Sequence, residues 1–380
     1  MPSRAQQLQD LGQSVWLDYI HRRELSSGQF KSQIRDQGVL GVTSNPTIFQ
    51  QAIGQSADYD AAIEPRLARG LSGIALFESL AIEDVQTACD LLRPVYERTG
   101  GLDGRVSIEV SPYLAGETAA TIEEARRLHR EVARGNVMIK VPATAAGLPA
   151  VTRLTAEGIC VNVTLIFSLA RYEQVMDAYL SGLEQRAAQG LELAGIHSVA
   201  SFFVSRVDSK VDAAIEQRIA TLPAGSTELA ALERLRGRAA VANARLAYAR
   251  FLEVFGAERF KSLAARGANL QRPLWASTST KNKAYSDTLY VDELIGRDTV
   301  NTMPPQTLAA FNEHGLLETT ITRDLAGARA LFRRLPELGV PVDDLIWQLE
   351  DEGVKAFAKS FDALLATLEE KRAQMAGKPR

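Results

Sequence analysis

Eight short segments of aliphatic, β-branched or aromatic residues recur along the chain, and longer stretches with helical spacing separate them. Short apolar runs of this composition predict strands, and apolar residues three to four positions apart predict helices. We expect strands at residues 15–19, 39–43, 106–110, 137–141, 159–166, 198–204, 272–277 and 299–303. We expect helices at residues 75–97, 119–132, 169–188 and 241–254. This alternation predicts an α/β protein whose parallel sheet carries helices on its outer face.

Eight strand repeats favour a closed (β/α)8 TIM barrel over an open doubly wound sheet. The open sheet typically places a glycine-rich dinucleotide motif after its first strand. Here Gly100, Gly101 and Gly104 precede the third strand instead. We therefore predict one barrel domain over residues 1–380, with a helical insertion after strand six at about 207–265 and a helical extension at about 304–380.

The C-terminal stretch 354–375 is amphipathic. Its apolar residues lie near one face of a helix: Phe357, Phe361, Leu364, Leu365 and Leu368. A helix with one apolar stripe buries that stripe against a larger body. We expect it to pack on the barrel exterior, and we expect residues 377–380 to be frayed.

The charge balance is nearly neutral. Lys and Arg number 43 against 46 Asp and Glu, which gives a net charge of -3. No general attraction to nucleic acid or to an anionic membrane follows, so an anionic substrate needs a local site. Residues 1–10 lack the apolar core of a signal peptide, and no apolar run approaches the roughly 20 residues that span a bilayer. We expect a cytoplasmic monomer or homodimer.

Metal and redox chemistry have little support in the sequence. The two cysteines, Cys89 and Cys160, are too few for a disulfide framework and fit a reducing compartment. The four histidines lack the spacing of metal ligands: His21, His129, His197 and His314. We expect neither a metal nor another cofactor.

Lys140 lies in the fourth predicted strand, where side chains alternate between two faces. Val137, Ile139 and Val141 share the face toward the helices, so Lys140 points toward the barrel interior. A buried ammonium is costly unless it is paired or neutral. A lysine in a salt bridge inside the barrel, or one at a strand end that reaches water, is the alternative to a reactive amine.

Polar residues lie late on one face of seven strands. Besides Lys140 they are Asp18, Thr43, Asn45, Ser107, Glu109, Ser111, Asn162, Thr164, Ser201 and Ser277. Barrel enzymes gather catalytic groups at the C-terminal ends of several strands. One buried polar network can serve structure alone. The combination of a lysine with two carboxylates favours chemistry.

A desolvated lysine with two carboxylates suits Schiff-base catalysis. A free lysine has a pKa of about 10.4, and burial favours the neutral amine that attacks a carbonyl. Loss of water from the carbinolamine needs an acid, and cleavage of a carbon–carbon bond beside a hydroxyl needs a base. Glu109 and Asp18 can fill these roles if their environments separate their pKa values.

Three motifs in order resemble the transaldolase family. Residues 43–49 resemble its TSNPTIF-type signature, residues 137–144 its Schiff-base lysine motif and residues 162–168 its NVTLIFS-type segment. With residues 201–206 and 275–282, the resemblance covers about residues 18–282 and points to the longer bacterial form.

The resemblance implies transfer of a dihydroxyacetone unit from sedoheptulose 7-phosphate to glyceraldehyde 3-phosphate in the pentose phosphate pathway. It implies that Lys140 forms the imine, that Asp18 takes the C4 hydroxyl proton, and that Glu109 acts through a water held by Thr164. It further implies hydroxyl-binding and phosphate-binding residues, which are Asn45, Asn162 and Ser201 for the hydroxyls and Arg206 and Ser277 for the phosphate.

Two features depart from the family pattern or rest on weaker matches. No second phosphate-binding arginine aligns near Ser277, so Lys281 either replaces it or is a solvated loop lysine. Asp18 rests on a short strand, and a surface aspartate is the alternative there.

Three other functions remain open. A fructose 6-phosphate aldolase-like enzyme shares the fold and the lysine but carries a tyrosine where Phe203 stands. A catalytically silent barrel that binds a phosphosugar or a protein partner predicts no covalent adduct. A metal-dependent aldolase predicts loss of activity in chelator.

Overall fold

Eight parallel strands close into a barrel in this computed structural model, which describes residues 2–376. The expectation for residues 377–380 lies outside the described residues. Each strand pairs with the next, and the last pairs with the first. The strands are β1 (Gln13–Asp18), β2 (Gly41–Thr43), β3 (Arg105–Glu109), β4 (Val137–Pro142), β5 (Val161–Ile166), β6 (Ser198–Phe203), β7 (Gln271–Ala276) and β8 (Thr299–Met303). The predicted (β/α)8 barrel is confirmed.

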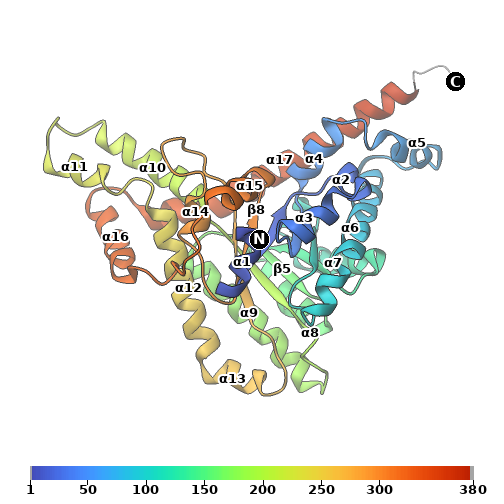
Figure 1. Ribbon diagram of the computed structural model, residues 1–380, viewed down its shortest axis with the longest axis horizontal. Coiled ribbons are helices and arrows are strands. Elements are labelled where there is room, and N and C mark those ends of the chain that lie inside the picture. The colour runs from blue at the N-terminus through green and yellow to red at the C-terminus, as the bar shows by residue number, and fades with distance from the viewer. Residues whose placement is uncertain (1, 377–380) are drawn as a thin grey trace.

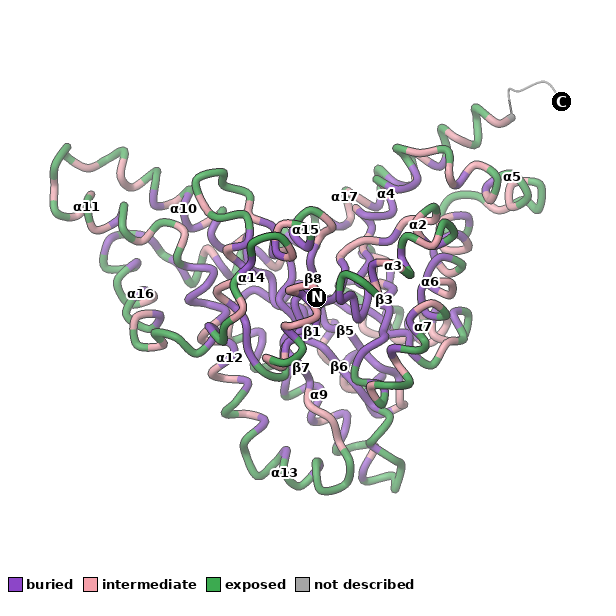
Figure 2. The backbone as a smooth tube through the Cα atoms, in the orientation of Figure 1, coloured by how far each residue is buried: buried purple, intermediate pink, exposed green. Residues whose placement is uncertain are grey.

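Helices surround the barrel and bury one face against it (Figures 1 and 2). Up to β6 they are α1 (Arg4–Gln7), α2 (Arg22–Ser27), α3 (Gln29–Asp36), α4 (Pro46–Gly54), α5 (Asp60–Ala68), α6 (Gly73–Arg98), α7 (Thr118–Val132), α8 (Gly147–Glu157) and α9 (Leu169–Ala188), with short 3-10 turns η1 (Leu8–Leu11) and η2 (Pro112–Leu114). The periodic segments predicted at 75–97, 119–132 and 169–188 correspond to α6, α7 and α9.

Extra helices lie between β6 and β7 and after β8. The first group comprises α10 (Ser205–Ile219), α11 (Thr227–Glu233), α12 (Ala239–Gly256) and α13 (Glu258–Ala264). A short helix α14 (Leu289–Asp292) precedes β8, and α15 (Pro305–His314), α16 (Leu325–Glu337) and α17 (Val342–Ala376) follow it. In Figure 1, α10 and α11 extend away from the barrel, and α16 lies beside α12.

The location predicted for the C-terminal helix was wrong. The helix α17 begins at Val342, before the predicted stretch, and it contacts α4, α6, α10 and β5. Because α4 follows β2 and α10 follows β6, on opposite sides of the barrel, a helix that contacts both crosses the barrel mouth (Figure 1). Gly353 allows the close approach, since a Cβ there would lie 3.0 Å from Cδ2 of Leu165. The apolar stripe predicted that the helix is covered, but not which surface covers it.

Candidate active site

A cavity of about 480 Å³ opens at the C-terminal ends of the strands, beneath α17. Eight of the ten residues that the sequence predicted for the site line it: Asp18, Asn45, Lys140, Thr164, Ser201, Arg206, Ser277 and Lys281. Glu109 and Asn162 lie behind its wall. The strand ends therefore bring together residues that are far apart in the sequence, as the barrel geometry requires.

Lys140 occupies the late part of β4 and is only 4% exposed. Its Nζ atom donates a hydrogen bond to the backbone oxygen of Ser44 at 3.2 Å and lies 3.2 Å from Oε2 of Glu109. The ring centre of Phe357, from α17, lies 5.6 Å from the same nitrogen. The amine thus sits between a carboxylate, a carbonyl and an aromatic face, with little access to water.

Glu109 stands next to Lys140 on the neighbouring strand, where β3 and β4 pair these two residues. Its side chain is 5% exposed, and neither carboxylate oxygen has a hydrogen bond aligned to any group among residues 2–376. Burial raises the pKa of Glu109, and the charge of Lys140 opposes that rise. A carboxyl group with a raised pKa holds a proton more readily than an exposed one, which suits a group that gives and takes protons.

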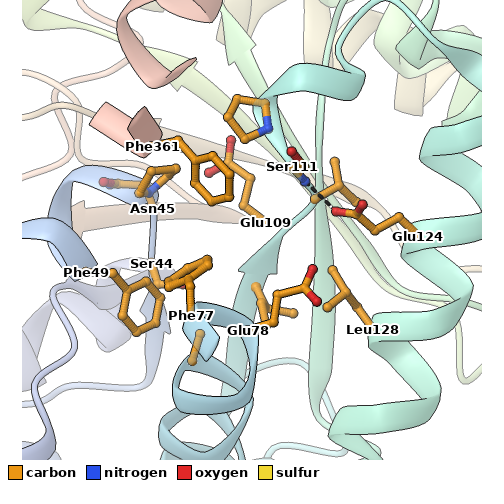
Figure 3. Close-up of a pocket in the computed structure, with 15 residues that line it drawn as sticks. Ser44, Asn45, Phe49, Phe77, Glu78, Glu109, Ser111, Glu124, Leu128 and Phe361 are labelled. Atoms are coloured by element: carbon orange, nitrogen blue, oxygen red, sulfur yellow. Dashed lines mark hydrogen bonds between the residues drawn. The ribbon is translucent and has the colours of Figure 1, made fainter. Parts of the chain in front are cut away.

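A second, narrower cavity lies on the far side of Glu109, between β3, α6 and α7 (Figure 3). Phe361 of α17 and Asn45 close it near Glu109, and Glu124 accepts a hydrogen bond from the backbone N–H of Ser111 at 2.6 Å. Ser111 therefore faces this second cavity and not the barrel mouth.

Asp18 is half-buried at the end of β1 and lines the cavity, so the surface alternative for this residue was wrong. The hydroxyl of Thr43 donates to Oδ1 of Asp18 at 2.7 Å, and the same hydroxyl lies 2.7 Å from that of Thr302 on β8. Burial raises the pKa of Asp18, while Lys140, the Thr43 hydrogen bond, Lys281 and Arg206 lower it.

Asn162 and Ser201 bond to each other below the cavity floor. The Asn162 side chain donates to the Ser107 hydroxyl at 3.0 Å, and its Oδ1 accepts from the Ser201 hydroxyl at 2.7 Å. Asn162 is 0% exposed, and only Ser201 of this pair lines the cavity. The structure therefore places Asn162 where it holds Ser201.

Thr164 lies beside a register shift between β5 and β6, where Leu165 adopts a φ of 61°. Such an irregularity redirects the side chains next to it. The Thr164 hydroxyl lines the cavity and has no hydrogen-bond partner in the part of the chain that the structure describes. A buried hydroxyl in this state has its hydrogen-bonding capacity free for water or a ligand.

Arg206 and Lys281 supply the positive charge of the cavity rim. Arg206 lies in the first turn of α10, with its guanidinium carbon 5.2 Å from the ring centre of Phe203 and 5.9 Å from that of Phe357. Burial lowers the pKa of Arg206, and Asp18 opposes this. Lys281, on the loop after β7, donates to the hydroxyl of Ser279 at 2.7 Å.

Ser277 has a more constrained position than the sequence indicated. It adopts a φ of 56°, and its hydroxyl lies 3.0 Å from that of Ser205 at the start of α10. Asn45 likewise has a structural task, because its Oδ1 accepts the backbone N–H of Ile48 at 3.0 Å and caps α4. Both side chains still line the cavity.

Comparisons with known proteins show the family of this chain. The family model described as Transaldolase/Fructose-6-phosphate aldolase matches residues 15–368. The chain belongs to the transaldolase/fructose-6-phosphate aldolase family.

Curated relatives named as transaldolases match over nearly their whole length. Transaldolase 1 of Streptomyces coelicolor is 52% identical over 364 residues, which cover 96% of this chain and 93% of the relative. The transaldolase of Saccharopolyspora erythraea is 49% identical and covers 97% of both chains. That of Trichodesmium erythraeum is 46% identical and covers 96% of both. The resemblance to transaldolases, the fold and the enzyme class expected from the sequence are confirmed.

Several cavity residues of this transaldolase-family chain escaped the sequence interpretation, among them Thr302, Ser279 and Phe357. Thr302 is the last residue but one of β8, and period-two alternation applied to that strand would have found it. Ser279 stands in the same serine- and threonine-rich segment as Ser277, where spacing does not tell which hydroxyl turns inward. Phe357 belongs to the apolar stripe of α17, and its role depends on where that helix docks.

Within residues 2–376 no three His, Cys, Asp or Glu side chains gather closely enough to hold a metal ion. In the same part of the chain, no helix combines the length and apolarity needed to cross a membrane.

Proposed function

We propose that this enzyme transfers a dihydroxyacetone unit between phosphorylated sugars through a Schiff base on Lys140. The donor and acceptor would be sedoheptulose 7-phosphate and glyceraldehyde 3-phosphate, giving erythrose 4-phosphate and fructose 6-phosphate. One observation carries the proposal: a nearly inaccessible lysine lies 3.2 Å from a buried glutamate in a cavity that Asp18 also lines.

In the first half of the reaction, the neutral Lys140 amine attacks the C2 carbonyl of the donor ketose. The resulting carbinolamine loses water to form the imine, and Glu109 exchanges the required protons through a water bound near Thr164. The Glu109 oxygens, which accept no aligned hydrogen bond, and the Thr164 hydroxyl, which has no hydrogen-bond partner among the described residues, support such a water.

In the second half, Asp18 removes the proton from the C4 hydroxyl, and the C3–C4 bond breaks. The electron pair of the C3–C4 bond moves into the protonated imine, which becomes an enamine, and the aldose departs. The enamine then attacks the acceptor aldehyde, and hydrolysis of the new imine releases the product. Asn45, Ser201 and, through Ser201, Asn162 would hold the hydroxyls. Arg206, Ser277 and Lys281 would hold the phosphate, with Arg206 as a planar fork and Lys281 as a point charge.

Phe203 supports transfer over release of free dihydroxyacetone, because it lines the cavity with an apolar ring and brings no hydroxyl that could hold an attacking water.

The organisation of the chain also fits one catalytic unit, since its buried apolar residues form one connected core cluster. We infer a single barrel domain with a helical insertion and a helical extension. The free, buried thiols of Cys89 and Cys160 support a cytoplasmic location.

Borohydride reduction in the presence of fructose 6-phosphate tests the proposal. We expect a stable adduct of dihydroxyacetone mass on the peptide that contains Lys140, in the presence or absence of chelator. Lys140→Met is the matched control and should give none. An adduct elsewhere, or none in the parent enzyme, overturns the proposal. Product analysis with and without erythrose 4-phosphate separates transfer from aldol cleavage.

A further inference from the structure

The loop between β7 and β8 presents Ser277, Ser279 and Lys281 to the cavity, yet Lys281 is an exposed residue on an irregular segment. A lysine side chain carries substantial rotamer entropy, and a mobile loop adds backbone entropy. A charge that binds phosphate from such a loop needs the backbone beneath it to be held in place.

Two local contacts close this loop around Lys281. The Thr280 hydroxyl donates to the backbone oxygen of Ser286 at 2.7 Å, across the segment that contains Lys281. Within it, Asn282 forms a tight turn, because its backbone oxygen accepts the N–H of Tyr285 at 3.1 Å. The turn gives the segment a shape but does not by itself fix it to the barrel.

Tyr285 makes that attachment. Its hydroxyl donates to Oδ2 of Asp212 on α10 at 2.8 Å, and Oδ1 of Asp212 accepts the backbone N–H of Gly237 at 2.8 Å. Gly237, just before α12, adopts a φ of 69°, and a Cβ there would lie 2.6 Å from the Tyr285 ring. The tyrosine ring therefore occupies space that is open only because Gly237 has no side chain.

The same helix carries Arg206 in its first turn, so α10 is connected to both phosphate-facing cations. Asp208, one turn before Asp212 on α10, makes a parallel contact with the hydroxyl of Tyr290 at 2.8 Å. Tyr290 belongs to α14, beyond the turn that carries Lys281. The pair of Asp208 and Tyr290 thus anchors the far end of the connection, and the pair of Asp212 and Tyr285 anchors the part next to the cavity.

We propose that Tyr285 and Asp212 are positioning residues for phosphate recognition, and that the helices inserted after β6 serve to hold the Lys281 segment at the cavity rim. The inference rests on the proposed function, since it takes Lys281 as a phosphate ligand. It assigns a role to the inserted helices that the transaldolase chemistry itself does not require.

Steady-state kinetics with fructose 6-phosphate and with unphosphorylated fructose test this role. Tyr285→Phe removes one hydroxyl and keeps the ring that fills the space at Gly237. We expect KM for fructose 6-phosphate to rise about tenfold, on the scale of one charge-assisted hydrogen bond. We expect kcat/KM for fructose to stay within about twofold, because the sugar lacks the group that Lys281 binds. Tyr290→Phe is the matched control, because it loses an equivalent contact to α10. We expect the ratio of kcat/KM for fructose 6-phosphate to that for fructose to stay unchanged in this variant.

A double-mutant cycle decides whether Tyr285 acts through Lys281. If it does, Tyr285→Phe adds nothing to the KM of a Lys281→Met variant, because the cation that it positions is already gone. Additive effects, or an equal loss with both substrates, overturn the inference. Borohydride trapping on Lys140 is run on every variant. An adduct that persists with an unchanged substrate ratio refutes only this inference, whereas a missing adduct in the parent enzyme refutes the proposed function.

Discussion

The ring of Phe357 lies 5.6 Å from Nζ of Lys140, so the C-terminal helix supplies one wall of the cavity around the amine. The same ring lies 5.9 Å from the guanidinium carbon of Arg206. An aromatic face between two cations attracts both and excludes water from the space between them.

Replacing Phe357 with alanine should slow imine formation about tenfold, because water that enters through the opened wall opposes the loss of water from the carbinolamine. The rate of borohydride-trapped adduct formation with fructose 6-phosphate measures this effect. Trp347→Ala provides the control, since Trp347 is a half-exposed aromatic residue on the same helix, outside the cavity. An unchanged trapping rate in Phe357→Ala would show that the aromatic wall has no part in imine formation.

The hydrogen bond from Thr43 to Asp18 should set the acid limb of the pH profile. Burial raises the pKa of Asp18 above its usual value, and the Thr43 hydroxyl opposes that rise. A base must be ionised, so kcat/KM falls as pH decreases through this raised pKa. Thr43→Val removes the opposing contact, and the acid limb should move up by about one pH unit. Thr43→Ser keeps a hydroxyl and should leave the limb in place; equal limbs in all three proteins would exclude Asp18 as the base.

Glu109→Gln keeps the size of the side chain and removes its proton exchange. We expect kcat to fall about a hundredfold, the lower range for loss of a general acid–base group. Glu124→Gln tests whether any carboxylate of the second cavity would have the same effect, and we expect a change below about twofold. Comparable losses in the two variants would point to the cavity as a whole, with no special role for the neighbour of Lys140.

A buried ion pair below the surface of α2 and α6 should make stability depend on pH. The Asp84 carboxylate accepts a hydrogen bond from the hydroxyl of Tyr59 at 2.8 Å, and its Oδ1 atom lies 2.7 Å from a guanidinium nitrogen of Arg22. Burial raises the pKa of Asp84 to about 6. Because the folded-state pKa exceeds the unfolded one, this group's contribution to stability is complete below about pH 4 and is lost as pH rises through about 6.

Arg22→Met should therefore destabilise the protein by about 3 kcal/mol at pH 7, since it leaves a buried carboxylate without its cation. The loss should shrink at pH 5, where the carboxyl group takes up a proton. Urea midpoints at pH 5, 7 and 8 measure this trend. Arg23→Met, which removes an exposed arginine from a surface pair, should cost less than about 1 kcal/mol. A pH-independent loss in Arg22→Met would contradict the assignment.

The strands were predictable because their period is local. Runs of β-branched residues bounded by polar turns are a property of neighbouring positions, and the eight observed strands overlap all eight predicted ranges. Small errors remain where pairing is partial. Val39 and Leu40 precede β2, although the N–H of Leu40 already donates to the backbone oxygen of Val15 at 2.8 Å.

The candidate site was less completely predictable, because the face of a strand on which a residue lies does not tell how far its side chain is from the cavity. Alternation placed Asn162 and Ser201 inward, but only the structure shows that Asn162 bonds to Ser201 from below and does not reach the cavity. Alternation also has no meaning beyond a strand end. Ser277 and Ser279 therefore could not be ranked until the backbone turn at Ser277 was known.

The sequence by itself determined the barrel, the inward lysine on its fourth strand and the carboxylates on its first and third strands, since all of these follow from periodicities of a few residues. The tertiary structure alone decided that α17 crosses the mouth and that Tyr285 reaches α10. Both depend on which surfaces pack together once the barrel has formed. The free energy that favours this packing comes from many contacts between segments that are far apart in the sequence. The sequence shows that an apolar stripe or a tyrosine hydroxyl requires a partner. Only the packed structure shows which residues that partner consists of.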